Sequence, residues 1–127
     1  MAGNGASGRV DQIEVVGIRA MGVIGVLDHE KEQAQPFEVD LVIDADLRGA
    51  GATDDLGQTV HYGLAAERVV EVINNESYEL IERVAQRIAD EILGMERVDA
   101  VEVTIRKLRP PIPHHVEYSA VRIHRRN

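Results

Sequence analysis

The chain has 127 residues, of which 44% are apolar and none is cysteine or tryptophan, so we expect one domain with an aliphatic core. The lack of cysteine excludes a disulfide framework, a thiolate nucleophile, a cysteine zinc site and an iron–sulfur cluster. The net charge of −8 and the four scattered aromatic residues argue against a nucleic-acid partner.

The glycine-rich start of the chain has neither the basic region nor the apolar region of a signal peptide. We therefore expect residues 1–10 to form a flexible leader and residues 11–127 to form a single domain. No apolar run approaches the ~20 residues of a membrane span, so we expect a cytoplasmic protein without a membrane partner.

Two strands are expected in the first half of the chain. From Gln12 to Ala20 apolar and polar residues alternate and change phase once, which predicts a strand with a bulge near Val15-Val16-Gly17. From Phe37 to Leu47 the alternation is regular, with one apolar and one acidic face. Residues 22–36 between them are too polar to be core, and we expect them to form an excursion loop.

The period of the apolar residues then changes to 3.6, which predicts two helices over residues 62–74 and 78–93. Turn and N-cap chemistry between the helices is supplied by Asn74, Asn75 and Ser77. Gly94 stands where a residue in the left-handed conformation would end the second helix.

Two further strands are expected, over Ala100–Lys107 and about Glu117–Arg125, joined through a stiff proline-rich segment at 110–113. The order ββααββ predicts an α+β fold, a four-stranded antiparallel sheet with both helices on its apolar face. The bare sheet edges predict a closed homo-oligomer.

Charge is unevenly distributed along the chain. Residues 11–60 carry eleven acids and three bases, whereas residues 97–127 carry seven bases and three acids. We expect the two regions to attract each other within one sheet or across subunits, and a basic binding tail is the alternative.

Lys107 is a candidate for proton transfer because the strand alternation gives it the phase of Val101, Val103 and Ile105. A lysine that loses hydration there gives up its proton more readily, and the prolines that follow would hold the strand end rigidly. The alternative is a lysine that snorkels from a strand end.

Three other residues have both a chemical and a structural interpretation. Tyr62, at the start of the first helix, can donate a proton or serve as an aromatic staple against the first turn. Glu82, near the start of the second helix, can accept two parallel N–H bonds from a ligand or stabilise the helix dipole. Glu30 lies in the polar loop, where solvation is the default expectation.

Metal and phosphate chemistry have no support in the sequence. The five histidines lack zinc-site spacing, and the adjacent pair His114 and His115 would point to opposite sides of a strand. We expect no metal site. No glycine fingerprint follows a strand, and no serine lies in a nucleophile elbow.

Several segments, in this order and spacing, resemble the dihydroneopterin aldolase family of folate biosynthesis over about residues 11–125. They are Gly17-Ile-Arg19, Gly22-Val-Ile-Gly25 with Glu30, Gln35-Pro-Phe37, Thr53-Asp-Asp-Leu56, Thr59-Val-His-Tyr-Gly63, Leu80-Ile-Glu82, and Lys107 with Pro110-Pro-Ile-Pro113. The resemblance implies the tunnel fold, in which ββααββ subunits close into a ring and two rings stack into an octamer.

The resemblance also implies a reaction. Members cleave 7,8-dihydroneopterin by a metal-free retro-aldol reaction to 6-hydroxymethyl-7,8-dihydropterin and glycolaldehyde, without a cofactor, and commonly epimerise the substrate as well. The C=N bond of the ring accepts the electrons, so no Schiff base to lysine is needed.

By the same resemblance, Lys107 would act as general base through water, and Tyr62 of a neighbouring subunit would protonate the enamine-like intermediate. Glu30 would orient substrate and water, and Glu82 would anchor the amino-pyrimidine edge. Further substrate-binding positions would be Leu80 and Ile81, with Thr59 and Val60 from the neighbour.

One position departs from the family pattern, because many members carry a histidine where this chain has Ile24. The substrate preference and the ratio of aldolase to epimerase activity therefore stay open. So do three alternatives, namely a dihydroneopterin triphosphate epimerase, a non-catalytic pterin- or purine-binding ring, and a purely structural α+β module. An enzyme that binds the triphosphate should carry several basic residues at the mouth of its pocket, and the segment 28–36 offers only Lys31.

Overall fold

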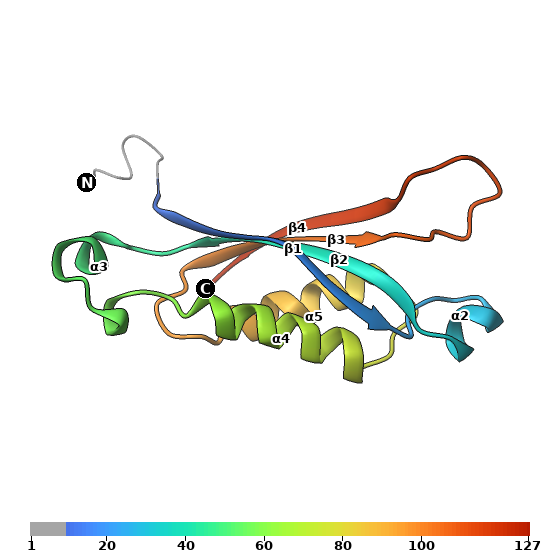
Figure 1. The fold of residues 1–127 in the computed structure, drawn as a ribbon, viewed down its shortest axis with the longest axis horizontal. Coiled ribbons are helices and arrows are strands. Elements are labelled where there is room, and N and C mark those ends of the chain that lie inside the picture. The colour runs from blue at the N-terminus through green and yellow to red at the C-terminus, as the bar shows by residue number, and fades with distance from the viewer. Residues whose placement is uncertain (1–9) are drawn as a thin grey trace.

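The computed structural model describes residues 10–127, and residues 1–9 of the expected leader lie outside the described residues. Four strands form one antiparallel sheet in sequence order: β1 (Gln12–Gly22), β2 (Gln35–Asp44), β3 (Ala100–Lys107) and β4 (Ser119–Arg126). Helices α4 (Tyr62–Asn75) and α5 (Ile81–Leu93) lie side by side on one face of this sheet (Figure 1). The predicted ββααββ arrangement is confirmed.

The predicted bulge lies in β1. The register of β1 against β2 shifts between Val15 and Ile18, and Gly17 in the bulge has φ 77°, a left-handed conformation that glycine adopts without steric cost. The Gly17 N–H donates to Asp40 Oδ1 at 2.9 Å, so the extra residue is fixed to the neighbouring strand.

The core lies between the sheet and the two long helices. The apolar face of β2 is fully buried, as the alternation predicts, and it meets the apolar stripes of α4 and α5. Burial of each large apolar side chain stabilises the folded state by roughly 1.5–3 kcal/mol. The largest buried residues of these elements are Phe37, Leu41, Ile43, Ile73, Ile88 and Ile92.

On the other face of the sheet, acidic residues of β2 pair with a basic residue of β3. Arg106 binds Asp40 at 2.7 Å and Glu38 at 3.3 Å. The hydrogen bond from Arg106 is the largest of the contacts that hold the pKa of the Asp40 carboxyl below its ordinary value, although burial opposes them. The attraction expected between the acidic and the basic region of the chain therefore operates within one sheet.

The start of α5 and the conformation of the glycine that ends it differ from the prediction. The helix begins at Ile81 rather than residue 78, and its N-cap residue is Leu80, so the residues expected to cap it do not. Glu76 and Leu80 are instead extended, and Tyr78 between them forms a parallel bridge with Ile24. Gly94 ends the helix as predicted, but with φ −77° rather than in the left-handed conformation, which Arg97 adopts instead.

Three short elements were not predicted. They are the helices α2 (Asp28–Glu32) and α3 (Arg48–Thr53) and the 3-10 turn η1 (Leu56–Gln58). Helix α2 lies within residues 22–36, which were expected to form an excursion loop too polar to be core. That expectation is wrong for Ile24 and Glu30, because both residues are buried. None of the helices in residues 10–127 is long and apolar enough to cross a lipid bilayer.

Candidate active site

Glu30 and Lys107 form a buried ion pair at one end of the sheet. The distance from Lys107 Nζ to Glu30 Oε2 is 2.6 Å, the Glu30 side chain is 1% exposed and that of Lys107 is 12% exposed. The expectation that Glu30 is solvated is therefore wrong, since the helical turn of α2 directs its side chain inward. Lys107 has the predicted phase and faces a carboxylate, so it is not a snorkelling lysine.

Local contacts hold the Glu30 carboxylate in place. Its Oε1 accepts the N–H of Leu27 at 3.3 Å, and its Oε2 accepts from Gln35 Nε2 at 3.3 Å as well as from Lys107. Burial raises the pKa of Glu30, but these hydrogen bonds and the charge of Lys107 together leave it below its ordinary value. The carboxylate is therefore ionised at neutral pH.

Two backbone segments meet beside this pair. Ile24 bridges Tyr78, and the Gly25 N–H donates to the Tyr78 carbonyl oxygen at 3.0 Å, which attaches the segment after β1 to the α4–α5 connection. Ile24, at the position where the resemblance implies a histidine, is fully buried in the core. A pocket of about 240 Å³ opens here, lined by Val23, Gly25, Lys31, Ser77, Tyr78 and Glu79.

Helix α5 begins at the same end of the sheet as α2 and the end of β3 (Figure 1), and Glu82 lies in its first turn. Its side chain is exposed and makes no hydrogen bond or ion pair within residues 10–127. The preceding Leu80 is 53% exposed. A carboxylate in this setting is available to a ligand, and its charge also favours the helix N-terminus.

Tyr62, Thr59 and Val60 lie at the opposite end of the molecule. The turn before them is fixed by a 2.7 Å hydrogen bond from Arg97 Nε to the Gly57 carbonyl oxygen, beyond the end of α5. Glu82 and the C-cap Gly94 are twelve positions apart along α5, or about 18 Å at ~1.5 Å per residue. One chain thus does not bring Tyr62 to Lys107.

The exposure of these three residues differs. Tyr62 is 62% exposed, which rules out the staple against the first helical turn, whereas Val60 is buried. The N-cap of α4 is His61, whose Nδ1 accepts the N–H of Leu64 at 3.0 Å. A pocket of about 500 Å³ lies between this end of α4 and the end of α5, with Thr59 and His61 among its lining residues.

The sequence interpretation missed two features of the site. Gly25 contacts Glu30 so closely that no side chain fits on it, and the closely spaced glycines Gly22 and Gly25 were the available signal. The ion pairs of Arg87 with Glu76 and Glu91 have no signal in the sequence, because charged residues on a helix are most often solvated. Within residues 10–127, no group of three His, Asp or Glu side chains converges as a metal site.

The antiparallel sheet with two helices on one face and exposed edges is the subunit of the tunnel fold. The family model described as "FolB: Dihydroneopterin aldolase" matches residues 13–124, and the chain belongs to this family. It is 45% identical over 103 residues to dihydroneopterin aldolase of Streptomyces coelicolor, covering 81% of this chain and 87% of the relative.

Other relatives agree with this assignment. The Bacillus subtilis dihydroneopterin aldolase is 36% identical over 118 residues, covering 92% of this chain and 98% of the relative. The solved structure of Escherichia coli dihydroneopterin aldolase in complex with neopterin is similar with a TM-score of 0.83 and 27% identity, covering 91% of this chain and 98% of that one.

Proposed function

We propose that this protein cleaves 7,8-dihydroneopterin by a retro-aldol reaction to 6-hydroxymethyl-7,8-dihydropterin and glycolaldehyde, without a metal ion. The buried pair of Glu30 and Lys107, 2.6 Å apart, carries the proposal together with the family membership. A lysine amine held by a carboxylate in a water-poor setting is suited to moving a proton at a defined place.

The proposed mechanism begins with proton removal. Lys107, acting in its neutral amine form through a water molecule, takes the proton of the side-chain hydroxyl whose deprotonation starts cleavage of the adjacent C–C bond. The electrons of that bond pass into the C=N bond of the dihydropterin ring, glycolaldehyde leaves, and an enamine remains. Glu30 orients Lys107 and the water. Protonation of the enamine carbon by Tyr62 then gives the hydroxymethyl product, and the proton taken up by Lys107 returns through water to the Tyr62 phenolate.

Substrate recognition is assigned to the start of α5. The two oxygens of Glu82 are free to accept parallel N–H bonds from the amino-pyrimidine edge of a pterin, aided by the backbone of Leu80 and Ile81. The complex of the E. coli relative with neopterin supports a pterin ligand. Lys31 Nζ lies 3.5 Å from Glu79 Oε2, so the lysine that lines the 240 Å³ pocket is already paired with a carboxylate. This pairing disfavours a triphosphate substrate.

The proposed active site lies between two copies of the chain. The separation of Tyr62 from Lys107 within one chain supports this, because both are needed at one substrate. We propose that Thr59, Val60 and Tyr62 of a neighbouring copy complete the site, in a ring that closes the β1 and β4 edges and stacks into an octamer. Epimerisation of dihydroneopterin would follow from reversal of the same cleavage before glycolaldehyde leaves.

The experiment incubates the purified oligomer with 7,8-dihydroneopterin, with and without EDTA, and follows the products by chromatography. Equal amounts of hydroxymethyldihydropterin and glycolaldehyde, unchanged by EDTA, are expected. Absence of glycolaldehyde in an intact oligomer would refute the aldolase activity, and complete loss of activity with EDTA would refute the metal-free mechanism. Trapping of substrate on Lys107 by borohydride would instead indicate a Schiff base.

A further inference from the structure

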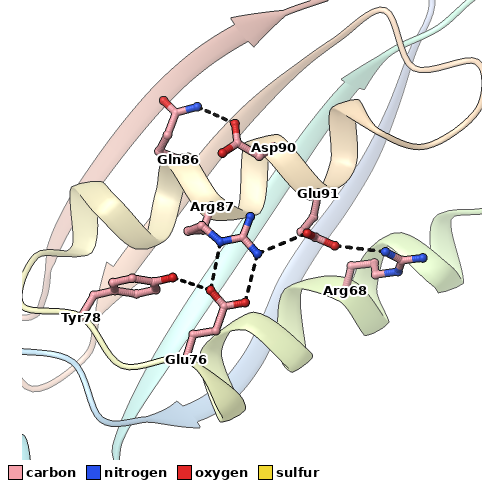
Figure 2. Close-up of polar contacts among 7 residues, drawn as sticks. All are labelled: Arg68, Glu76, Tyr78, Gln86, Arg87, Asp90 and Glu91. Carbon is pink, nitrogen blue, oxygen red and sulfur yellow. Dashed lines mark hydrogen bonds and ion pairs between the residues drawn. The ribbon is translucent and has the colours of Figure 1, made fainter.

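A network of charged side chains connects α4, the segment that follows it and α5 (Figure 2). Arg87 makes two hydrogen bonds to Glu76, from Nε to Oε1 at 3.0 Å and from Nη2 to Oε2 at 3.1 Å. The same Nη2 donates to Glu91 at 3.2 Å, and Arg68 donates to the other Glu91 oxygen at 3.0 Å. The end of α4 is thereby fixed to the middle of α5.

Tyr78 belongs to this network through its side chain and to the active site through its backbone. Its hydroxyl donates to Glu76 Oε1 at 2.5 Å, while its carbonyl oxygen accepts the Gly25 N–H at 3.0 Å. Gly25 touches Glu30, and Glu30 binds Lys107. Contacts therefore run without interruption from Arg87 to the proposed general base.

The network is held firmly. Glu76 and Arg87 are 30% and 21% exposed, so solvent screens their interaction less than that of a surface pair. The hydrogen bonds from Arg87 and Tyr78 hold the pKa of Glu76 below its ordinary value, so the pair stays charged at neutral pH. Leu80, the N-cap of α5, makes no side-chain cap hydrogen bond.

We propose that Arg87 and Glu76 are positioning residues, which hold the 76–80 connection so that Tyr78 fixes Gly25 and Glu30 against Lys107. Neither residue touches the proposed substrate, and both act through the Tyr78 backbone. The same connection leads into Glu82, so the network also sets where the pterin edge is bound relative to the base. This inference rests on the proposed function of Glu30 and Lys107.

The kinetic test places Arg87→Met in the wild type and in Glu30→Gln and measures kcat and KM for dihydroneopterin in each. Arg87→Met is expected to lower kcat about tenfold in the wild type, since small displacements near reacting groups are costly. In the Glu30→Gln variant the same change is expected to lower kcat less than about twofold, because the Glu30 carboxylate that Arg87 positions is already absent. Equal losses in the two backgrounds would overturn the proposal.

A matched control is available on the same helix. Asp90→Ala removes the 2.9 Å hydrogen bond from Gln86, a neighbouring contact that does not join the Arg87 network (Figure 2). It is expected to leave kcat within about twofold of the wild type. A loss of kcat as large as that of Arg87→Met would mean that any disturbance of α5 lowers activity. That result would refute the positioning role of Arg87.

Amide hydrogen exchange gives a second measurement that needs no substrate. In Arg87→Met the Gly25 amide is expected to exchange at least ~10-fold faster, while the Asp99 amide, bound to the Asp44 carbonyl at the other end of the sheet, keeps its protection. Equal acceleration at both amides would indicate global destabilisation and contradict the proposal. If this protein proves not to cleave dihydroneopterin, a selective loss of protection at the Gly25 amide in Arg87→Met would still support the role of Arg87 in holding Gly25. Only the proposed function would then be refuted.

Discussion

Gly25 and Glu30 lie in direct contact, which is possible because Gly25 has no side chain. A Cβ atom on Gly25 would lie 2.6 Å from the Glu30 Cβ, closer than two such atoms approach. Since Glu30 holds Lys107 at 2.6 Å, the space left by this glycine determines where the carboxylate of the ion pair lies.

Gly25→Ala is therefore expected to displace Glu30 and to lower kcat at least ~10-fold, because the base loses its orienting partner. Overpacking should also reduce the free energy of unfolding by about 1–3 kcal/mol. Steady-state kinetics and urea denaturation measure the two effects. The control is Gly51→Ala, whose added methyl would meet no atom within 4 Å. Unchanged kcat in Gly25→Ala would show that the position of Glu30 is not critical.

Lys107→Ala is expected to lower turnover at least ~100-fold, as loss of a general base does. Pterin affinity should change little, because Glu82 and not Lys107 is assigned to the pterin edge. Turnover is followed by product chromatography and affinity by equilibrium binding of a product pterin. Weaker binding with unchanged turnover would reassign Lys107 to substrate anchoring.

Mixed oligomers test whether the active site is shared between chains. Tyr62→Phe and Lys107→Ala are each expected to be inactive alone, yet an oligomer refolded from equal amounts of both should recover about a quarter of the wild-type sites, since each site takes one residue from each of two copies. Activity is measured before and after refolding the mixture. If mixing restores nothing, both residues belong to one chain's site and the shared site is wrong.

The stability of the protein is expected to depend on pH through Glu30. Burial raises its pKa, but the hydrogen bonds and the Lys107 charge bring it below the ordinary value of 4.5, so the unfolded chain binds this proton at a higher pH than the folded one. The contribution to stability is present above about 4.5 and is lost as pH falls through the folded pKa.

Glu30→Gln should accordingly be less stable than the wild type at neutral pH, with a gap that narrows as pH falls below about 4.5. Urea denaturation across this range measures the gap. Glu67→Gln is a suitable control, because Glu67 is exposed on α4 and takes part in no ion pair within residues 10–127. A gap that stays constant on acidification would contradict this assignment to Glu30.

Periodic patterns predicted most of the fold correctly because they reflect burial of whole faces. The alternation in β2 and the 3.6-residue stripes of α4 and α5 each record which side meets the core, and the phase change in β1 records its bulge. The start of α5 was placed too early because the bridge between Tyr78 and Ile24 draws residues before Ile81 into an extended conformation. That bridge joins segments more than 50 residues apart, and no local propensity contains it.

The sequence by itself determined the order of strands and helices along the chain, the apolar core, the phase of Lys107 and the segments that resemble the family. Tertiary structure alone decided the state of Glu30, because a residue in a charged run looks solvated until the contact with Gly25 and the approach of Lys107 are known. The tertiary structure also decided that Tyr62 and Lys107 lie at opposite ends of the folded molecule. Periodicity reports which face of an element is buried, whereas the distance between two polar side chains depends on how the elements pack.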